Sequence, residues 1–143
     1  MNSARASLKP ADVNVGDAVT TMDIDLNTTL IVAGAIATRD FMPVHHDRDY
    51  AQGQGAPDLF MNILSTNAYC ARFVTDWAGP ETFVKNISIR LGVPAIPNKN
   101  LVFTGEVLSK TDNGDESDIE VSLKATNELG DHATGTVLIS LPN

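Results

Sequence analysis

The sequence predicts an α+β fold in which an antiparallel β-sheet wraps around one long α-helix. Residues 59–76 place apolar side chains at helical spacing along one broad face. Four later segments alternate apolar and polar side chains, as half-buried strands do. A sheet and a helix that each have one apolar face must both be covered, and packing one against the other is the economical solution.

A short strand and a short helix are expected before the long helix. Residues 21–26 alternate in polarity, with three apolar side chains on one side, which indicates a half-buried strand. Residues 27–37 are ambiguous, because the threonine and β-branched residues near their start favour a strand. Their alanine-rich remainder and a cap at Asn27 or Thr28 favour a helix, and we interpret them as a short helix.

The long helix has a start and a stop signal. An oxygen of Asp58 can accept from the free N–H groups of the first turn, and Gly79 with Pro80 can end the helix. The only cysteine, Cys70, falls at an apolar position, so we interpret it as a packing residue. The broad face consists of Phe60, Ile63, Leu64, Asn67, Cys70, Ala71, Val74 and Trp77.

The four segments after the helix are expected to form a meander. They cover residues 86–91, 101–107, 119–126 and 133–141, and turn-forming residues separate them. An early strand, a central helix and an antiparallel meander together predict the α+β hot-dog fold, with the sheet wrapped around the helix.

Length and charge narrow the range of functions. The 143 residues fit one domain over 1–143, in which we expect 1–15 to form a mobile tail. A net charge of −8 argues against nucleic-acid binding, and no apolar run is long enough to cross a membrane. The N-terminus does not resemble a secretory signal, and a lone cysteine suits the reducing cytoplasm.

One loop concentrates ionisable side chains. Seven of the thirteen residues from 39 to 51 are Asp, His or Arg. Asp40 and His45 lie five residues apart, and Pro43 can fix a turn that brings both to one water molecule, where an imidazole exchanges protons near neutral pH. Spacing alone leaves an ordinary charged surface loop equally plausible. We expect no metal, because the neighbouring ligands His45, His46, Asp47 and Asp49 would point in different directions.

The same loop resembles a known signature. Asp40-Phe41-Met42-Pro43-Val44-His45, followed by Asp47, is similar to the Asp-x-Asn-Pro-aliphatic-His-x-Asp pattern of MaoC-like R-specific enoyl-CoA hydratases. The stretch from Arg90 to Pro94 resembles that family's strand after the central helix. Further segments, including 74–80, are similar to the small subunits of heteromeric MaoC-like hydratases that act in steroid side-chain degradation.

The resemblance implies a hydration reaction. Asp40 and His45 would hold a water that adds across the trans-2 double bond of an enoyl-CoA. The backbone N–H of Met61, in the segment that matches the family's His-Gly-Met, would face the thioester oxygen. Met42 replaces the family's asparagine, and Arg39 replaces a glycine. Four residues would support the loop or the substrate: Met42, Pro43, His46 and Gly55.

The resemblance also implies an acyl-CoA substrate, in which CoA is part of the substrate and no separate cofactor is needed. It implies a second MaoC-like hot-dog subunit or a homodimer, and exposed sheet edges favour such pairing. Small residues at 33–37 and 53–55 suit either a wide acyl tunnel or close packing. Two alternatives stay open: a hot-dog acyl-CoA thioesterase, and a non-catalytic subunit that completes a partner's pocket. We expect His132 to face solvent.

Overall fold

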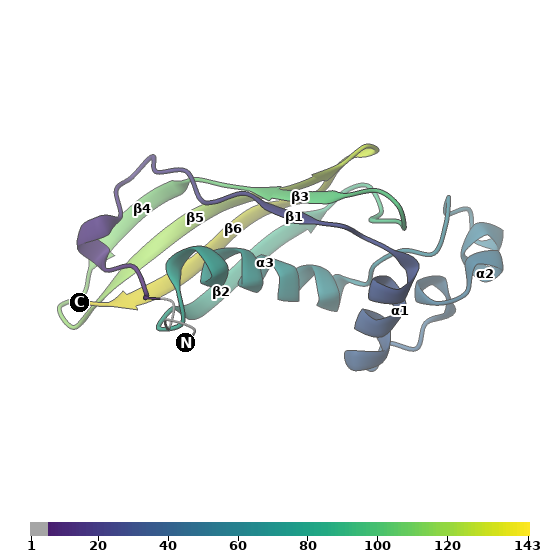
Figure 1. The fold of residues 1–143 in the computed structure, drawn as a ribbon, viewed down its shortest axis with the longest axis horizontal. Helices are drawn as coiled ribbons and strands as arrows, with labels where there is room; N and C mark the ends of the chain where they lie inside the picture. The colour runs from purple at the N-terminus through teal and green to yellow at the C-terminus, as the bar shows by residue number, and fades with distance from the viewer. Residues whose placement is uncertain (1–5) are drawn as a thin grey trace, which may run out of the picture.

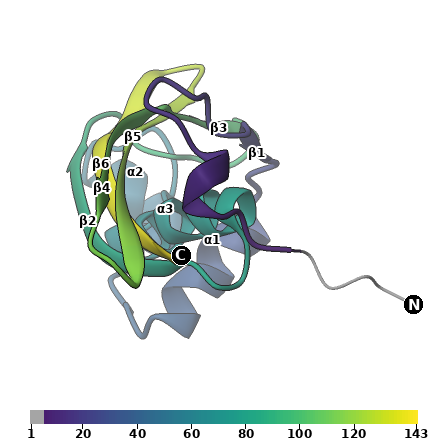
Figure 2. The ribbon, with the colours of Figure 1, turned by 90° about the vertical axis from the view of Figure 1, so that its left-hand side faces the viewer.

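A computed structural model describes residues 6–143, and its central element is helix α3 (Ile63–Ala78). A curved antiparallel sheet lies along one side of α3 and wraps around it when viewed from the end (Figures 1 and 2). The buried face of the helix includes Cys70, Phe73 and Val74. This is the predicted hot-dog arrangement of one long helix against one sheet.

Helix α3 begins four residues later than the sequence suggests. Its N-cap is Asn62, whose side-chain oxygen accepts from the Ser65 N–H at 3.0 Å, and Gly79 ends the helix with φ 98° as predicted. Asp58 is therefore not the cap, and its carboxylate instead accepts from the Leu59 N–H and from Arg48.

The residues just before Asn62 are not helical. The N–H of Phe60 donates to the Val44 carbonyl and that of Met61 to the Ala95 carbonyl. Apolar periodicity cannot place a helix start when the residues before the helix also bury apolar side chains, and here Leu59 and Met61 are both buried.

The sheet contains the predicted strands in a different order. The strands are β1 (Met22–Ile24), β2 (Phe83–Leu91), β3 (Leu101–Thr104), β4 (Val107–Asp112), β5 (Glu116–Asn127) and β6 (Gly130–Pro142). All pairings are antiparallel, and the order is β1-β3-β5-β6-β2, with β4 also paired to β5.

The expected meander is wrong for its first strand. Strand β2 pairs with β6, the last strand, from Phe83 opposite Ser140 to Leu91 opposite Ala133. The long connection between β2 and β3 lets the chain cross to the other side of the sheet, whereas the tight turn at Leu129 forces β5 and β6 together. The strand predicted over 101–107 is β3 only as far as Thr104, and β4, which begins at Val107, was not predicted. Gly105 separates the two strands and lies so close to the Ser122 carbonyl that a Cβ there would overlap it.

Two shorter helices lie beyond the N-terminal end of α3 (Figure 1). Helix α1 (Thr28–Ala37) confirms the interpretation of residues 27–37, and its cap is Asn27, which accepts from the Leu30 N–H. Helix α2 (Arg48–Gly53) was not predicted, and Asp47 caps it. No helix among residues 6–143 is long and apolar enough to cross a membrane.

The mobile tail expected over residues 1–15 is wrong for residues 8–13. Residues 1–5 lie outside the described residues. In the described part, the N–H of Leu8 donates to the Ala78 carbonyl, and a 3-10 turn, η1 (Pro10–Asp12), precedes Val13, which is fully buried. Residues 8–13 are thus packed on the domain, because an apolar side chain at position 13 gains more by burial than by solvent exposure.

Candidate active site

The end of helix α1 positions Asp40. The Arg39 N–H donates to the Ile36 carbonyl at 3.0 Å and the Asp40 N–H to the Ala35 carbonyl at 2.9 Å. This pair of bonds closes the helix as a Schellman motif, with Arg39 in the left-handed region at φ 58°. Asp40 is therefore held by its own backbone N–H two residues after the C-cap, Thr38.

A 3-10 turn, η2 (Pro43–His45), positions His45. The proline opens the turn, and the His45 N–H donates to the Met42 carbonyl at 3.1 Å. The His45 ring is buried, packs edge-on against the Phe60 ring, and places Nδ1 2.7 Å from the Phe60 carbonyl oxygen. A carbonyl only accepts, so Nδ1 carries a hydrogen, and the neutral ring has its lone pair on Nε2.

The turn brings the two predicted residues together. Nε2 of His45 lies 3.4 Å from Oδ2 of Asp40, and about a quarter of the Asp40 side chain is exposed. This distance is longer than a charge-assisted hydrogen bond, so both atoms can bond one water between them. An imidazole lone pair beside a carboxylate is an arrangement suited to moving protons.

A third side chain, Asn62, holds the carboxylate. Its Nδ2 donates to Oδ2 of Asp40 at 3.0 Å and to Oγ1 of Thr38 at 2.8 Å. The hydrogen bond from Asn62 lowers the pKa of Asp40, the Met42 N–H and the charge of His45 act in the same direction, and partial burial opposes them. This role of Asn62 was not predicted, because the residue falls within the predicted helix over 59–76 and lies 22 positions from Asp40 in the sequence.

A small cavity lies next to this group, between α1 and α3. Its volume is about 250 Å³, and its lining consists of Gly34, Ala37, Thr38, Ser65, Ala68, Tyr69 and Arg72. Thr38 is shared with the Asn62 network, which places the cavity beside the Asp40 carboxylate. Of the small residues expected to widen a tunnel, Gly34 and Ala37 line it, whereas Ala35 is fully buried.

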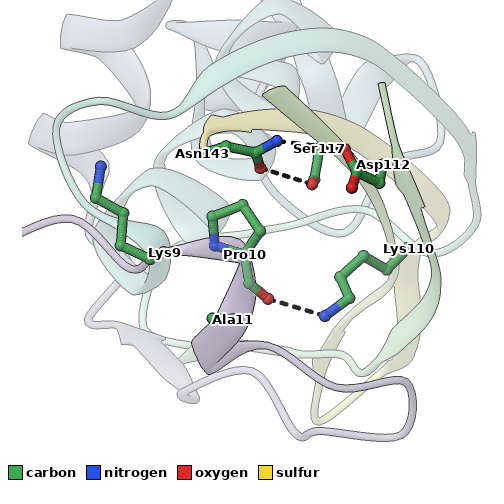
Figure 3. A pocket seen from close by; sticks show the side chains of 7 residues that line it. All are labelled: Lys9, Pro10, Ala11, Lys110, Asp112, Ser117 and Asn143. Carbon is green, nitrogen blue, oxygen red and sulfur yellow. Dashed lines mark hydrogen bonds between the residues drawn. The ribbon is translucent and has the colours of Figure 1, made fainter. Parts of the chain in front are cut away.

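A larger cavity, of about 620 Å³, lies at the opposite end of the molecule, near the C-terminus (Figures 1 and 3). Two lysines line it, Lys9 and Lys110, and Lys110 donates to the carbonyls of Pro10 and Val13. Its lining contains no histidine. This cavity therefore offers no imidazole for proton exchange near neutral pH.

Comparison with known proteins identifies the family. The β subunit of a 3-oxo-4,17-pregnadiene-20-carboxyl-CoA hydratase from Mycobacterium tuberculosis is 48% identical over 113 residues, which cover 79% of this chain and 84% of the relative. No protein-family model matches the sequence. The chain belongs to the MaoC-like hydratase family.

Solved structures agree with this assignment. A chain in the crystal structure of the ChsH1–ChsH2 complex from M. tuberculosis superposes with a TM-score of 0.85 at 44% identity, over 90% of this chain and 98% of that chain. The unliganded R-hydratase PhaJ1 from Pseudomonas aeruginosa has the same fold, with a TM-score of 0.82 at 22% identity, over 96% of this chain and 87% of that chain.

The backbone N–H of Met61, expected to be the oxyanion donor, is already engaged in a hydrogen bond. The Met61 N–H donates to the Ala95 carbonyl at 2.9 Å, so it is not free to face a thioester oxygen. This hydrogen bond connects the residues before Asn62 to the loop that contains Ala95. Within residues 6–143, the first-turn N–H groups of Ile63 and Leu64 have no acceptor, as the first N–H groups of a helix lack intrahelical partners.

The other family positions support the loop in different ways. Met42 leaves its side chain half exposed, and its N–H lies 3.3 Å from Oδ1 of Asp40. His46 Nε2 lies 3.2 Å from the Phe41 carbonyl oxygen, which ties the loop together. Gly55 adopts φ 90° after α2, where a Cβ would meet nothing within 4 Å, so it serves the turn.

The expectation that His132 faces solvent is wrong. It is buried, with Nδ1 2.8 Å from the Val93 carbonyl oxygen and Nε2 2.9 Å from Thr66 Oγ1.

Among residues 6–143, no cluster of three His, Cys, Asp or Glu side chains is arranged to hold a metal ion.

Proposed function

We propose that this chain is a subunit of an enoyl-CoA hydratase, and that Asp40 and His45 add water across a trans-2 double bond. The observation that supports the proposal best is the 3.4 Å approach of His45 Nε2 to Asp40 Oδ2, with the histidine tautomer fixed by the Phe60 carbonyl. Both facing atoms are acceptors, so they can hold the two hydrogens of one water. The oxygen lone pair of that water is then free to attack.

The lowered pKa of Asp40 indicates which of the two residues accepts the proton from water. The hydrogen bond from Asn62 makes the carboxylate the weaker proton acceptor, so His45 Nε2 takes the proton as the water oxygen bonds to C3 of the substrate. The π electrons move onto the thioester oxygen as an enolate. When the enolate collapses, C2 takes the proton from the His45 imidazolium, which gives the 3-hydroxyacyl-CoA with water added across the bond.

The developing enolate needs hydrogen-bond donors. The Met61 N–H is engaged by Ala95, so we assign this role to the free N–H groups in the first turn of α3, at Ile63 and Leu64. They immediately follow Asn62, which contacts Asp40, and the helix dipole favours negative charge at this end.

The substrate is proposed to be a steroid enoyl-CoA with a short side chain, in β-oxidation of that side chain. The 250 Å³ cavity beside Asp40 has small residues at Gly34, Ala37 and Ala68, which leave room for a bulky apolar group. The hydratase subunit from M. tuberculosis, at 48% identity, carries a steroid-CoA substrate in its name.

The partner is proposed to be a second MaoC-like hot-dog subunit. Strand β2 is a sheet edge of nine residues, and Phe83 and Leu91 on it are exposed. An apolar edge of this length favours pairing with another sheet. The similar mycobacterial structure is a complex of two proteins. A cytoplasmic location belongs to the same proposal and is supported by Cys70, a buried free thiol.

The decisive experiment follows the ultraviolet absorbance of the enoyl thioester, with this chain alone and together with a candidate MaoC-like partner. We expect loss of absorbance without release of free CoA thiol, and faster use of a steroid enoyl-CoA than of crotonyl-CoA. Thiol release would instead identify a thioesterase. Equal or faster use of crotonyl-CoA would contradict the steroid assignment and leave the hydratase proposal standing.

A further inference from the structure

The side-chain amide of Asn62 forms hydrogen bonds with three groups. Oδ1 accepts from the Ser65 N–H, and the two Nδ2 hydrogens go to Thr38 Oγ1 and Asp40 Oδ2. The side chain is almost completely buried, with 1% of its surface exposed. An amide with all of its near partners satisfied has one orientation only, because a flip would set Oδ1 against the Asp40 carboxylate.

The Thr38 hydroxyl reinforces this orientation. It donates to the Gly34 carbonyl at 2.7 Å, so towards Asn62 it can only accept. Asn62 therefore presents one N–H to Thr38 and the other to Asp40 Oδ2, the same oxygen that lies 3.4 Å from His45 Nε2. The cap of α3 and the end of α1 thus meet at the reacting carboxylate.

We infer that Asn62 is a positioning residue for the proposed hydration, which holds Asp40 Oδ2 facing His45 and keeps that oxygen an acceptor. The inference rests on the proposed function. The loop itself supplies no side-chain amide, since the family's asparagine is replaced by Met42, whose contribution to Asp40 is its backbone N–H. The amide therefore comes from the cap of the central helix. This agrees with the lowered pKa of Asp40, of which the Asn62 hydrogen bond is the largest cause.

The test uses Asn62→Ser, because serine is also a good N-cap but brings no N–H donors. In the active complex, we expect kcat to fall by about tenfold to a hundredfold with little change in KM, as for a displaced reacting group. The pKa of Asp40 should rise at the same time, because the largest cause of its lowering is removed. The matched control is Asn67→Ala, also on α3, whose amide donates to the Ile63 carbonyl and touches neither Asp40 nor Thr38. Its kcat, its KM and its Asp40 pKa should stay those of the wild type.

A second variant and a direct titration keep the inference falsifiable. Asn62→Asp keeps the size and the cap but sets a carboxylate beside Asp40, so the Asp40 pKa should rise even further. Carbon-13 NMR of the Asp40 carboxyl measures its pKa without any turnover, and the pKa should rise in both variants. An unchanged Asp40 pKa in both variants would overturn the inference. Failure of the wild-type complex to hydrate any enoyl-CoA would instead overturn the proposed function.

Discussion

Two buried histidines make the same contact through Nδ1 and differ in what their second nitrogen faces. His45 and His132 each hold Nδ1 2.7–2.8 Å from a backbone carbonyl oxygen, at Phe60 and Val93. That contact fixes the same tautomer in both, with Nε2 as the acceptor. Nε2 of His45 faces the partly exposed Asp40 carboxylate, whereas Nε2 of His132 is closed off by the Thr66 hydroxyl. The same tautomer therefore occurs at both histidines. Whether the histidine can serve catalysis or only stability depends on whether a substrate can reach its Nε2.

The largest effect expected from this comparison is on turnover. His45→Ala and Asp40→Asn should each lower kcat/KM for hydration by at least about a hundredfold, the scale of a positioned acid–base group. Steady-state assays on the active complex measure it, with thermal unfolding as the check on folding. Wild-type turnover in both folded variants would remove the pair from the mechanism, and would leave the chain as a non-catalytic subunit.

Substitution of His132 should act on stability instead. His132→Leu leaves the Val93 carbonyl and the Thr66 hydroxyl without their partner, which should lower the free energy of unfolding by about 2 kcal/mol. Denaturant unfolding measures this, and turnover per folded molecule should stay within about twofold of the wild type. His46→Leu, on the exposed loop, is the control, with an expected change of at most about 0.5 kcal/mol. A hundredfold loss of turnover in folded His132→Leu would contradict the comparison.

The pH dependence of stability should sharpen the same contrast. Burial lowers the pKa of His132 below 6.5, so just below pH 6.5 the unfolded chain binds a proton at this residue that the folded chain does not. The free energy of unfolding should therefore fall as pH drops through 6.5 and level off below the folded pKa. The slope should be shallower in His132→Leu than in the wild type. Equal slopes between pH 5 and 7 would show that His132 titrates alike in both states.

The smallest effect concerns the backbone that carries Asp40. Arg39 adopts φ 58°, where a residue other than glycine is strained by about 1 kcal/mol. Arg39→Gly should raise the free energy of unfolding by about 0.5 kcal/mol, because the greater freedom of glycine in the unfolded chain offsets part of the relief. Asn98→Gly is the control at φ 62°, where asparagine is already tolerated, so a smaller gain is expected there. A loss of stability in Arg39→Gly would mean that the arginine side chain stabilises the loop.

Local patterns determined much of this protein from its sequence alone. Helical spacing revealed α3, period-two alternation revealed every strand except β4, and a cap at Asn27 or Thr28 supported α1, because each depends on neighbours within a few residues. The spacing of Asp40 and His45 around Pro43 predicted that the two would meet, and they do.

Only the tertiary structure decided the contacts between distant segments. The pairing of β2 with β6, the burial of His132 on Thr66 and the bond from Asn62 to Asp40 each join residues more than twenty positions apart. The engagement of the Met61 N–H by Ala95 is of the same kind. No periodicity encodes such partners, since they depend on how the sheet curves around α3 and which backbone groups are then left to be satisfied.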